Sequence, residues 1–229
     1  MASKARNLKN AQVKVSTGIS TTEITITDIT NTVNPVVTAT GHGLKDTDAV
    51  VAISDVTGMT DLNGYQYPFV IIDDDTLRLM GLDTTDMPIF GGAGKASPLT
   101  WQQGCEITGF SGLDGSTDEM DITTICSIAK ENEPGLRDYG NFSFEAHYVW
   151  DDKFRQEMIK INETQETRWF YIYQPPEPAR PKKDQGGMIL WEGFVTNTPV
   201  SWNVGSVPSG SINIRVTGRA YINNNVKGI

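Results

Sequence analysis

The sequence has few of the residues on which catalytic and metal sites depend. Its 229 residues include only two histidines, His42 and His147, and two cysteines, Cys105 and Cys126. Two cysteines are too few for a disulfide framework or a four-cysteine zinc site, and we interpret both as free, buried thiols. His42 lies between two glycines in a predicted turn, and His147 lies on the polar face of a predicted strand. No Ser/His/Asp or Cys/His catalytic set is therefore predicted.

Basic charge and long apolar runs are also scarce. The net charge is −9, whereas domains that grip nucleic acid are normally basic, so tight nucleic-acid binding is disfavoured. No apolar run approaches the roughly 20 residues that span a bilayer. Residues 1–10 are basic and have no apolar stretch of the signal-peptide type. We therefore expect no membrane span and no secretion signal.

The remaining candidates for a ligand site fail on spacing. The stretch Gly91–Lys95 resembles a phosphate-binding loop, but Ile89 and Ala96 stand where that motif needs Gly and Ser or Thr. The acidic turn Asp73–Asp75 lacks the spaced oxygen ligands of a calcium loop. The sequence therefore predicts no metal, no cofactor and no enzymatic activity.

Charge separates the chain into three segments. Residues 1–21 carry four basic groups and no acid, residues 22–98 carry eleven acids and three bases, and residues 99–229 carry seventeen acids and twelve bases. Short apolar runs between Gly, Asp and Asn clusters predict strands and turns throughout the middle segment. The glycines at 91, 92 and 94 predict a flexible exit from it. The middle segment is therefore predicted to be a unit of its own.

The last segment contains the clearest periodic patterns. Alternating apolar positions predict a strand from Phe142 to Trp150, and further strands follow at 168–173, 189–195 and 212–216. One helix is predicted after Asp151–Asp152, because Phe154, Met158 and Ile161 follow at helical spacing. Residues 174–187, rich in Pro and Lys, predict an exposed loop.

Two stretches resemble known phage proteins. The middle segment is similar to a small β-rich module that recurs in phage tail proteins. That resemblance rests on residues 37–44, 58–59, 62–64 and 75–79. The order of residues 120–131 and 134–140, then the aromatic strand, the helix and Gly193–Val195, is similar to siphophage major tail proteins. This second resemblance covers residues 1–21 and 99–229.

These resemblances imply a mainly β protein with two parts. Residues 1–21 and 99–229 form a tail-tube β-sandwich with one flanking helix, and residues 22–98 form an inserted β-rich domain on the tube exterior. Six copies form a ring, and stacked rings form the tube through which phage DNA passes without tight binding. About four strands per copy at about 4.8 Å spacing and about 40° tilt give a backbone diameter near 48 Å.

The resemblance further implies a protein made in the host cytoplasm that becomes part of the virion tail, with other tail proteins at the tube ends. A secretion-type tube protein and a carbohydrate- or receptor-binding tail module stay open as alternatives. The latter requires an exposed aromatic platform. We instead interpret six aromatic residues as part of the core between the sheet and the helix. These are Phe142, Phe144, Trp150, Trp169, Phe170 and Tyr171.

The segment from Asp114 to Tyr139 is the predicted main contact between copies. It combines β-branched residues with a charge-rich run in what we expect to be a long, irregular loop, and such loops are usually functional. The residues predicted to make the contact are Asp121, Thr123, Lys130, Glu131, Arg137 and Asp138. A further three, Asp114, Asp118 and Glu119, are predicted to lie in a solvated acidic loop or to line the lumen.

Overall fold

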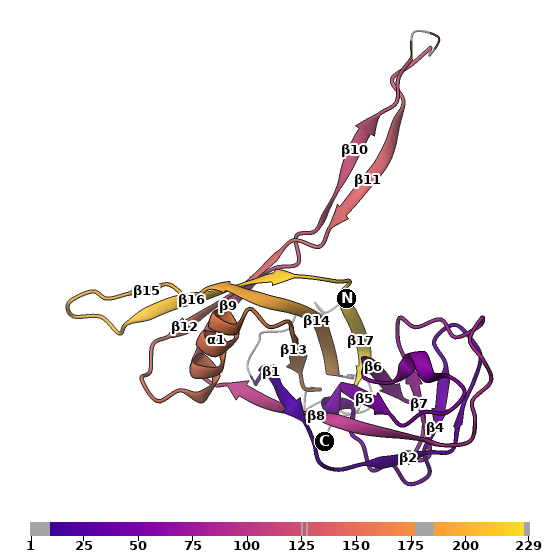
Figure 1. Ribbon diagram of the computed structural model, residues 1–229. Helices are drawn as coiled ribbons and strands as arrows, with labels where there is room; N and C mark the ends of the chain where they lie inside the picture. Colours follow the sequence, from indigo (N-terminus) through magenta and orange to yellow (C-terminus); the bar gives the residue numbers. More distant parts are fainter. Residues whose placement is uncertain (1–9, 125, 127, 177–185, 227–229) are drawn as a thin grey trace, which may run out of the picture. The chain divides into compact units, whose positions relative to one another are not determined.

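The computed structural model describes residues 10–124, 126, 128–176 and 186–226, and Figure 1 labels its elements. Contacts divide the chain into two compact units. The first unit comprises the chain up to Gln103, Phe170–Leu190, and the chain from Tyr221 onward. The second unit comprises Gly104–Trp169 and Trp191–Ala220. The strand order and single α-helix of the described residues confirm the predicted mainly β class with one helix.

Antiparallel strands make up the first unit, in the order β3-β4-β7-β6-β5-β8-β1-β13-β14, with β2 on β8 and β17 on β14. Its strands are β1 (Gln12–Ile19), β2 (Ile24–Ile26), β3 (Asp28–Ile29), β4 (Val36–Thr38), β5 (Val50–Ser54), β6 (Gln66–Ile71), β7 (Thr76–Leu79), β8 (Gly94–Gly104), β13 (Arg168–Gln174), the start of β14 (Gly186–Asn197) and β17 (Tyr221–Val226). Two short 3-10 helices, η1 (Asp46–Asp48) and η2 (Thr60–Leu62), complete it.

An apolar cluster fills the space between strands β2 to β8. All of its buried members lie between Ile24 and Ala96, and they include Ile53, Phe69 and Leu77. His42 is buried at its margin, where Nδ1 accepts a hydrogen bond from the Leu44 amide at 3.0 Å. The part of the chain with the distinct acidic composition therefore has an apolar cluster of its own.

The glycine-rich stretch before β8 is packed, which differs from the flexible exit predicted for it. The amide of Gly91 donates to the Thr57 carbonyl at 2.7 Å. A Cβ at Gly91 would lie 2.5 Å from Thr57 Oγ1, so no larger residue fits unless a neighbour moves. Glycine is needed here because two backbones approach closely, which composition alone does not distinguish from flexibility.

Hydrogen bonds link residues 46–48 to strands outside the predicted middle domain. Tyr171 Oη donates to the Thr47 carbonyl at 3.0 Å, and Trp101 Nε1 donates to the Asp48 carbonyl at 3.1 Å. The rings of Trp101 and Tyr171 meet edge to face at 4.7 Å, and burial raises the pKa of Tyr171. All four residues lie in the first unit, so the boundary between residues 22–98 and the rest stays a prediction.

The second unit contains four antiparallel strands in the order β14-β16-β12-β9. Strand β15 pairs with β16, and β10 and β11 form a separate two-stranded sheet. Its elements are β9 (Ile107–Gly112), β10 (Ser116–Asp121), β11 (Asn132–Asp138), β12 (Asn141–His147), α1 (Lys153–Thr164), the end of β14, β15 (Val200–Ser201) and β16 (Ser209–Val216). Residues 177–185, most of the predicted loop 174–187, lie outside the described residues.

Helix α1 covers the apolar face of this sheet, as its spacing predicts. Phe154, Met158 and Ile161 are buried. The ring centroid of Phe154 lies 6.2 Å from that of Phe144 in β12. The carboxylate of Asp152 caps the helix by accepting hydrogen bonds from the amides of Phe154 and Arg155. Trp191 is fully buried in the same layer, 4.4 Å from the ring of Phe142.

Candidate interaction surfaces

The longest exposed element of the second unit is the hairpin formed by β10 and β11, hereafter the arm. Figure 1 shows it as an extended ribbon continuing from β9 and β12. None of its strand residues is buried. Ser116 pairs with Asp138 and Asp121 with Asn132, with an irregularity between Thr117 and Glu119. The predicted irregular loop is therefore a paired hairpin, but one with no apolar core.

The arm is strongly acidic. Between Asp114 and Tyr139 the sequence has seven acidic and two basic side chains. Near its tip Lys130 pairs with Asp121 at 3.8 Å, and both side chains are more than half exposed, so the pair adds little stability. Exposed apolar side chains, including Met120 and Leu136, lie among these charges.

The base of the arm is fixed by two aspartates. Asp138 forms an ion pair with Arg215 of β16 at 2.7 Å and accepts a hydrogen bond from the Gly140 amide at 2.8 Å. The pKa of Asp138 is lowered mainly by the hydrogen bond from the Gly140 amide, and next by the hydrogen bond and charge of Arg215. Asp114 accepts a hydrogen bond from the Asn141 amide at 2.9 Å. These contacts hold both ends of the arm against β12 and β16.

Hydrogen bonds between the two chain segments of the arm continue one residue pair beyond Asp121 and Asn132, toward its tip. The Ile122 amide donates to the Glu131 carbonyl at 3.0 Å, and the Glu131 amide donates to Thr123 Oγ1 at 2.9 Å. Asp121 accepts from the Thr123 amide at 2.9 Å, and hydrogen bonding to Thr123 lowers the pKa of Asp121. The described tip residues are thus ordered by hydrogen bonds within the hairpin.

The arm contains every contact residue predicted from the sequence. Asp114 lies at the base, and β10 carries Asp118, Glu119 and Asp121. Thr123, Lys130 and Glu131 lie toward the tip, and β11 carries Arg137 and Asp138. Asp138 binds Arg215, whereas Arg137 lies 5.5 Å from the Tyr139 ring and has no ion pair among the described residues. Their role between copies stays a prediction.

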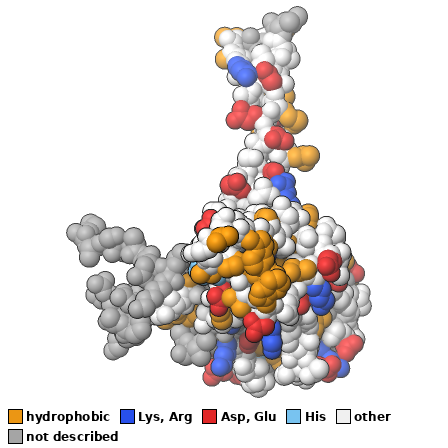
Figure 2. Space-filling view, turned by 90° about the vertical axis from the view of Figure 1, so that its left-hand side faces the viewer, with side chains coloured by type: hydrophobic (Ala, Val, Ile, Leu, Met, Phe, Trp, Pro, Cys, Tyr) orange, Lys and Arg blue, Asp and Glu red, His pale blue; other side chains and the backbone are white. Residues whose placement is uncertain are grey.

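A second exposed surface is an aromatic cluster that the sequence analysis missed. Tyr148 and Trp150 follow β12, and Trp202 follows β15. We call these three residues the aromatic patch, together with the exposed Val204 and Val207, which follow Trp202 in the loop between β15 and β16. Ring centroids are 5.0 Å apart for Tyr148–Trp150, 4.9 Å for Tyr148–Trp202 and 5.4 Å for Trp150–Trp202. Figure 2 shows a continuous hydrophobic area on this side.

The aromatic patch corrects the interpretation of Trp150 as core. Trp150 is 74% exposed and Trp202 is 53% exposed, whereas the other five aromatic residues assigned to the core are buried. The strand that the alternation suggests up to Trp150 ends at His147. The Tyr148 amide still donates to the Pro208 carbonyl at 2.8 Å, but Pro208 has no N–H with which to continue the ladder. The chain then turns into α1.

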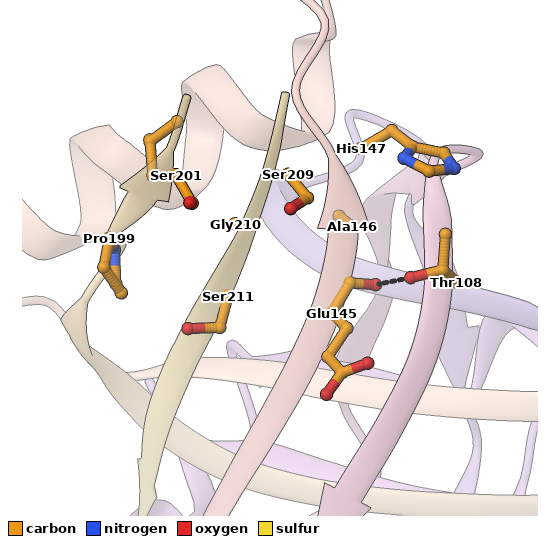
Figure 3. A pocket seen from close by; sticks show the side chains of 10 residues that line it. Thr108, Glu145, Ala146, His147, Pro199, Ser201, Ser209, Gly210 and Ser211 are labelled. Carbon is orange, nitrogen blue, oxygen red and sulfur yellow. Dashed lines mark hydrogen bonds between the residues drawn. The ribbon is translucent and has the colours of Figure 1, made fainter. Parts of the chain in front are cut away.

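A pocket of about 360 Å³ lies on the side of the sheet opposite α1 (Figure 3). Its lining includes Thr108, Glu145, His147, Ser209 and Ser211, and Thr108 Oγ1 donates to the Glu145 carbonyl at 3.2 Å. His147 is the cross-strand neighbour of Ser209.

The two cysteines are free, as predicted, but the prediction that they are buried is wrong. Both Cys105 and Cys126 are exposed. No three His, Cys, Asp or Glu side chains in the described ranges come together in a way that would hold a metal ion. Within the same ranges, no helix has the length and apolar character needed to cross a membrane.

Comparison with known proteins gives one family match. The model of a family described as phage tail tube, TTP, lambda-like, matches residues 84–226, which is more than half of the chain. No curated protein matches the chain.

Among solved structures, a chain of the anti-feeding prophage (AFP) baseplate is similar, with 11% identity and a TM-score of 0.42, over 56% of this chain and 86% of that one. A chain of the tail of an empty GTA particle is similar with 12% identity and a TM-score of 0.41, over 54% and 86% respectively. Likenesses at this level support no functional inference.

Proposed function

The chain belongs to the lambda-like phage tail tube family, and we propose that its copies assemble as stacked hexameric rings into the tube through which phage DNA is delivered into the host. As a member of that family it is a structural protein of the virion tail. The family match over residues 84–226 supports this function more than any other observation, since it spans the second unit, including the arm. It also favours a phage tube over a secretion-type tube.

The arm is proposed to make the main contact between copies. A two-stranded hairpin on its own is marginally stable in water, and this one has no buried side chain along its strands. Packing against a neighbouring copy would stabilise it by covering Met120 and Leu136. Asp121, Thr123, Lys130, Glu131, Arg137 and Asp138 are the residues we assign to that contact.

DNA is proposed to pass through the lumen without tight binding. The net charge of −9 supports this, because a protein surface that repels phosphate does not retain DNA. Asp114, Asp118 and Glu119 are exposed acidic residues and are candidates for the lumen-facing set. Synthesis in the host cytoplasm and contacts with other tail proteins at the tube ends belong to the same proposal.

Residues 22–98 are proposed to be an accessory domain on the tube exterior. Their own apolar cluster supports an independent fold. Replacing them with a short Gly/Ser bridge should leave a protein that still forms tubes, with a lower melting temperature because Tyr171 and Trp101 lose their partners at Thr47 and Asp48. A deletion variant that is folded by circular dichroism but never assembles would show that the segment belongs to the tube wall.

Electron microscopy of the purified protein tests the proposed function. We expect six-fold rings or stacked tubes in negative stain, at concentrations where sedimentation detects large species. A sample that remains monomeric at every concentration and ionic strength contradicts the proposal.

A further inference from the structure

The aromatic patch has the composition of an interface core. Aromatic residues are enriched and charged residues are depleted at the centres of protein interfaces. No charged residue occurs between Glu192 and Arg215, a stretch that includes Trp202, Val204 and Val207, although the whole chain is 21% charged. All three of these side chains are exposed. An exposed apolar surface of this kind marks an interaction site.

The ring geometry favours a protein partner over a carbohydrate. A sugar stacks on the open face of an aromatic ring, so a platform needs rings that lie side by side. Here the ring centroids of Trp150 and Trp202 lie 5.4 Å apart with the ring planes inclined by 33°, so the two rings pack partly against each other. Tyr148 meets Trp150 at 86°, edge to face. The three rings form a cohesive knob, which suits insertion against apolar side chains.

A buried positive charge lies directly behind the knob. Arg155 of α1 is only 4% exposed, and its guanidinium is stacked 4.2 Å from the Tyr148 ring. Among the described residues its guanidinium makes one hydrogen bond, from Nη2 to the Thr198 carbonyl at 3.4 Å, and its Nε and Nη1 have no partner there. No carboxylate of the described residues forms an ion pair with it. A buried cation without a counter-charge favours an acidic occupant in front of it.

We propose that the aromatic patch is the docking surface for the acidic arm of a second copy of this chain. The arm has the complementary properties: five more acidic than basic side chains, with Met120 and Leu136 exposed among them. The patch and the arm are different surfaces of the same unit, so each copy can offer its arm to the patch of the next in a head-to-tail contact, and such contacts close into rings or extend into filaments. The proposal rests on the proposed function and names the surface that receives the arm.

Charge substitution at the fully exposed Val204 separates this proposal from a general apolar contact. Val204→Asp places a negative charge against the acidic arm and should raise the protein concentration needed for tubes more than about tenfold. Val204→Lys should leave that concentration within about threefold of the unsubstituted protein, because its charge complements the arm. Ile89→Asp, at an exposed site of the first unit, is the matched control and should assemble normally.

Disulfide trapping identifies the occupant directly. Cys105 and Cys126 are exposed and are first replaced by serine. Leu136→Cys on the arm and Val204→Cys on the patch are then combined, and mild oxidation should give a ladder of dimers, trimers and longer species. Each single-cysteine variant should give dimers at most, because one thiol can form only one disulfide.

The outcomes are distinct. If the unsubstituted protein forms tubes but Val204→Asp and Val204→Lys weaken assembly equally, or the paired cysteines give no ladder, the arm is not the occupant. If neither substitution affects assembly and an oligosaccharide shows saturable binding by titration calorimetry that Trp202→Ala removes, the patch binds glycan and the proposal is overturned. If the unsubstituted protein forms no tubes, the proposed function fails, whereas a ladder in that case would still support the contact.

Discussion

The core beneath α1 and the arm belong to the same unit but use apolar residues in opposite ways. Around Trp191, aromatic and aliphatic side chains from β12, β14 and α1 are buried within one chain. Along the arm, Met120 and Leu136 remain exposed, and only the base is held by Asp114, Asp138 and Arg215. The first arrangement stabilises a single copy, whereas the second is stabilised only when another surface covers it. Folding and assembly should therefore respond to different substitutions.

The largest expected difference between core and arm is in how much a substitution lowers the free energy of unfolding. Trp191→Ala should lower it by about 3–5 kcal/mol, because a fully buried aromatic side chain leaves a cavity beside Phe142. Leu136→Ala on the arm should change it by less than about 0.5 kcal/mol. Urea unfolding of the unassembled protein measures both values. Equal losses at the two positions would remove the distinction between core and arm.

The next effect concerns assembly. Arg137→Glu should abolish tubes while leaving the melting temperature of the monomer nearly unchanged, because removing one partner of an interface charge pair can cost roughly 2–5 kcal/mol. Arg78→Glu, at an exposed arginine of β7, serves as the control. Sedimentation and negative stain report assembly, and circular dichroism reports the monomer. A destabilised monomer would instead place the role of Arg137 within its own chain.

A smaller effect on the core side comes from the helix cap. Asp152→Ala removes the acceptor for the Phe154 and Arg155 amides and should lower the free energy of unfolding by about 1 kcal/mol. Asp151→Ala, next to it and exposed, should have little effect. Tubes should still form from Asp152→Ala at temperatures well below its melting point. Loss of assembly without loss of stability would contradict the idea that folding and assembly depend on different residues.

The smallest effect is expected at the base of the arm under acid. The pKa of Asp138 is lowered, so its contribution to stability is present above the unfolded value of about 3.9 and is lost as the pH falls through the lower folded value. Amide exchange at Gly140, whose N–H donates to Asp138, should therefore quicken at the acid end of this range after correction for intrinsic rates. Asp138→Asn should show the faster exchange already at neutral pH. An unchanged rate would mean that Asp138 does not hold the base of the arm.

Most of the core could be predicted from the sequence, whereas the surfaces could not. Phe154, Met158 and Ile161 follow Asp152 at helical spacing, and burial enforces that spacing. Both faces of the arm strands are exposed, so no apolar alternation marks Ser116–Asp121 as a strand. The aromatic patch joins Trp150 and Trp202, which are far apart in sequence and meet only through the pairing of β15 and β12 with β16. Such proximity leaves no local pattern.

The tryptophans also differ in their optical environments. Trp169 and Trp191 are buried, so their emission should be blue-shifted and resistant to aqueous quenchers. Trp150 and Trp202 are exposed, and they should emit at longer wavelength and be quenched by acrylamide. Covering those two rings would move the emission maximum of the whole protein toward the blue and reduce quenching. The unlabelled protein thus carries an intrinsic fluorescence signal for contacts at this patch, which can be followed in real time.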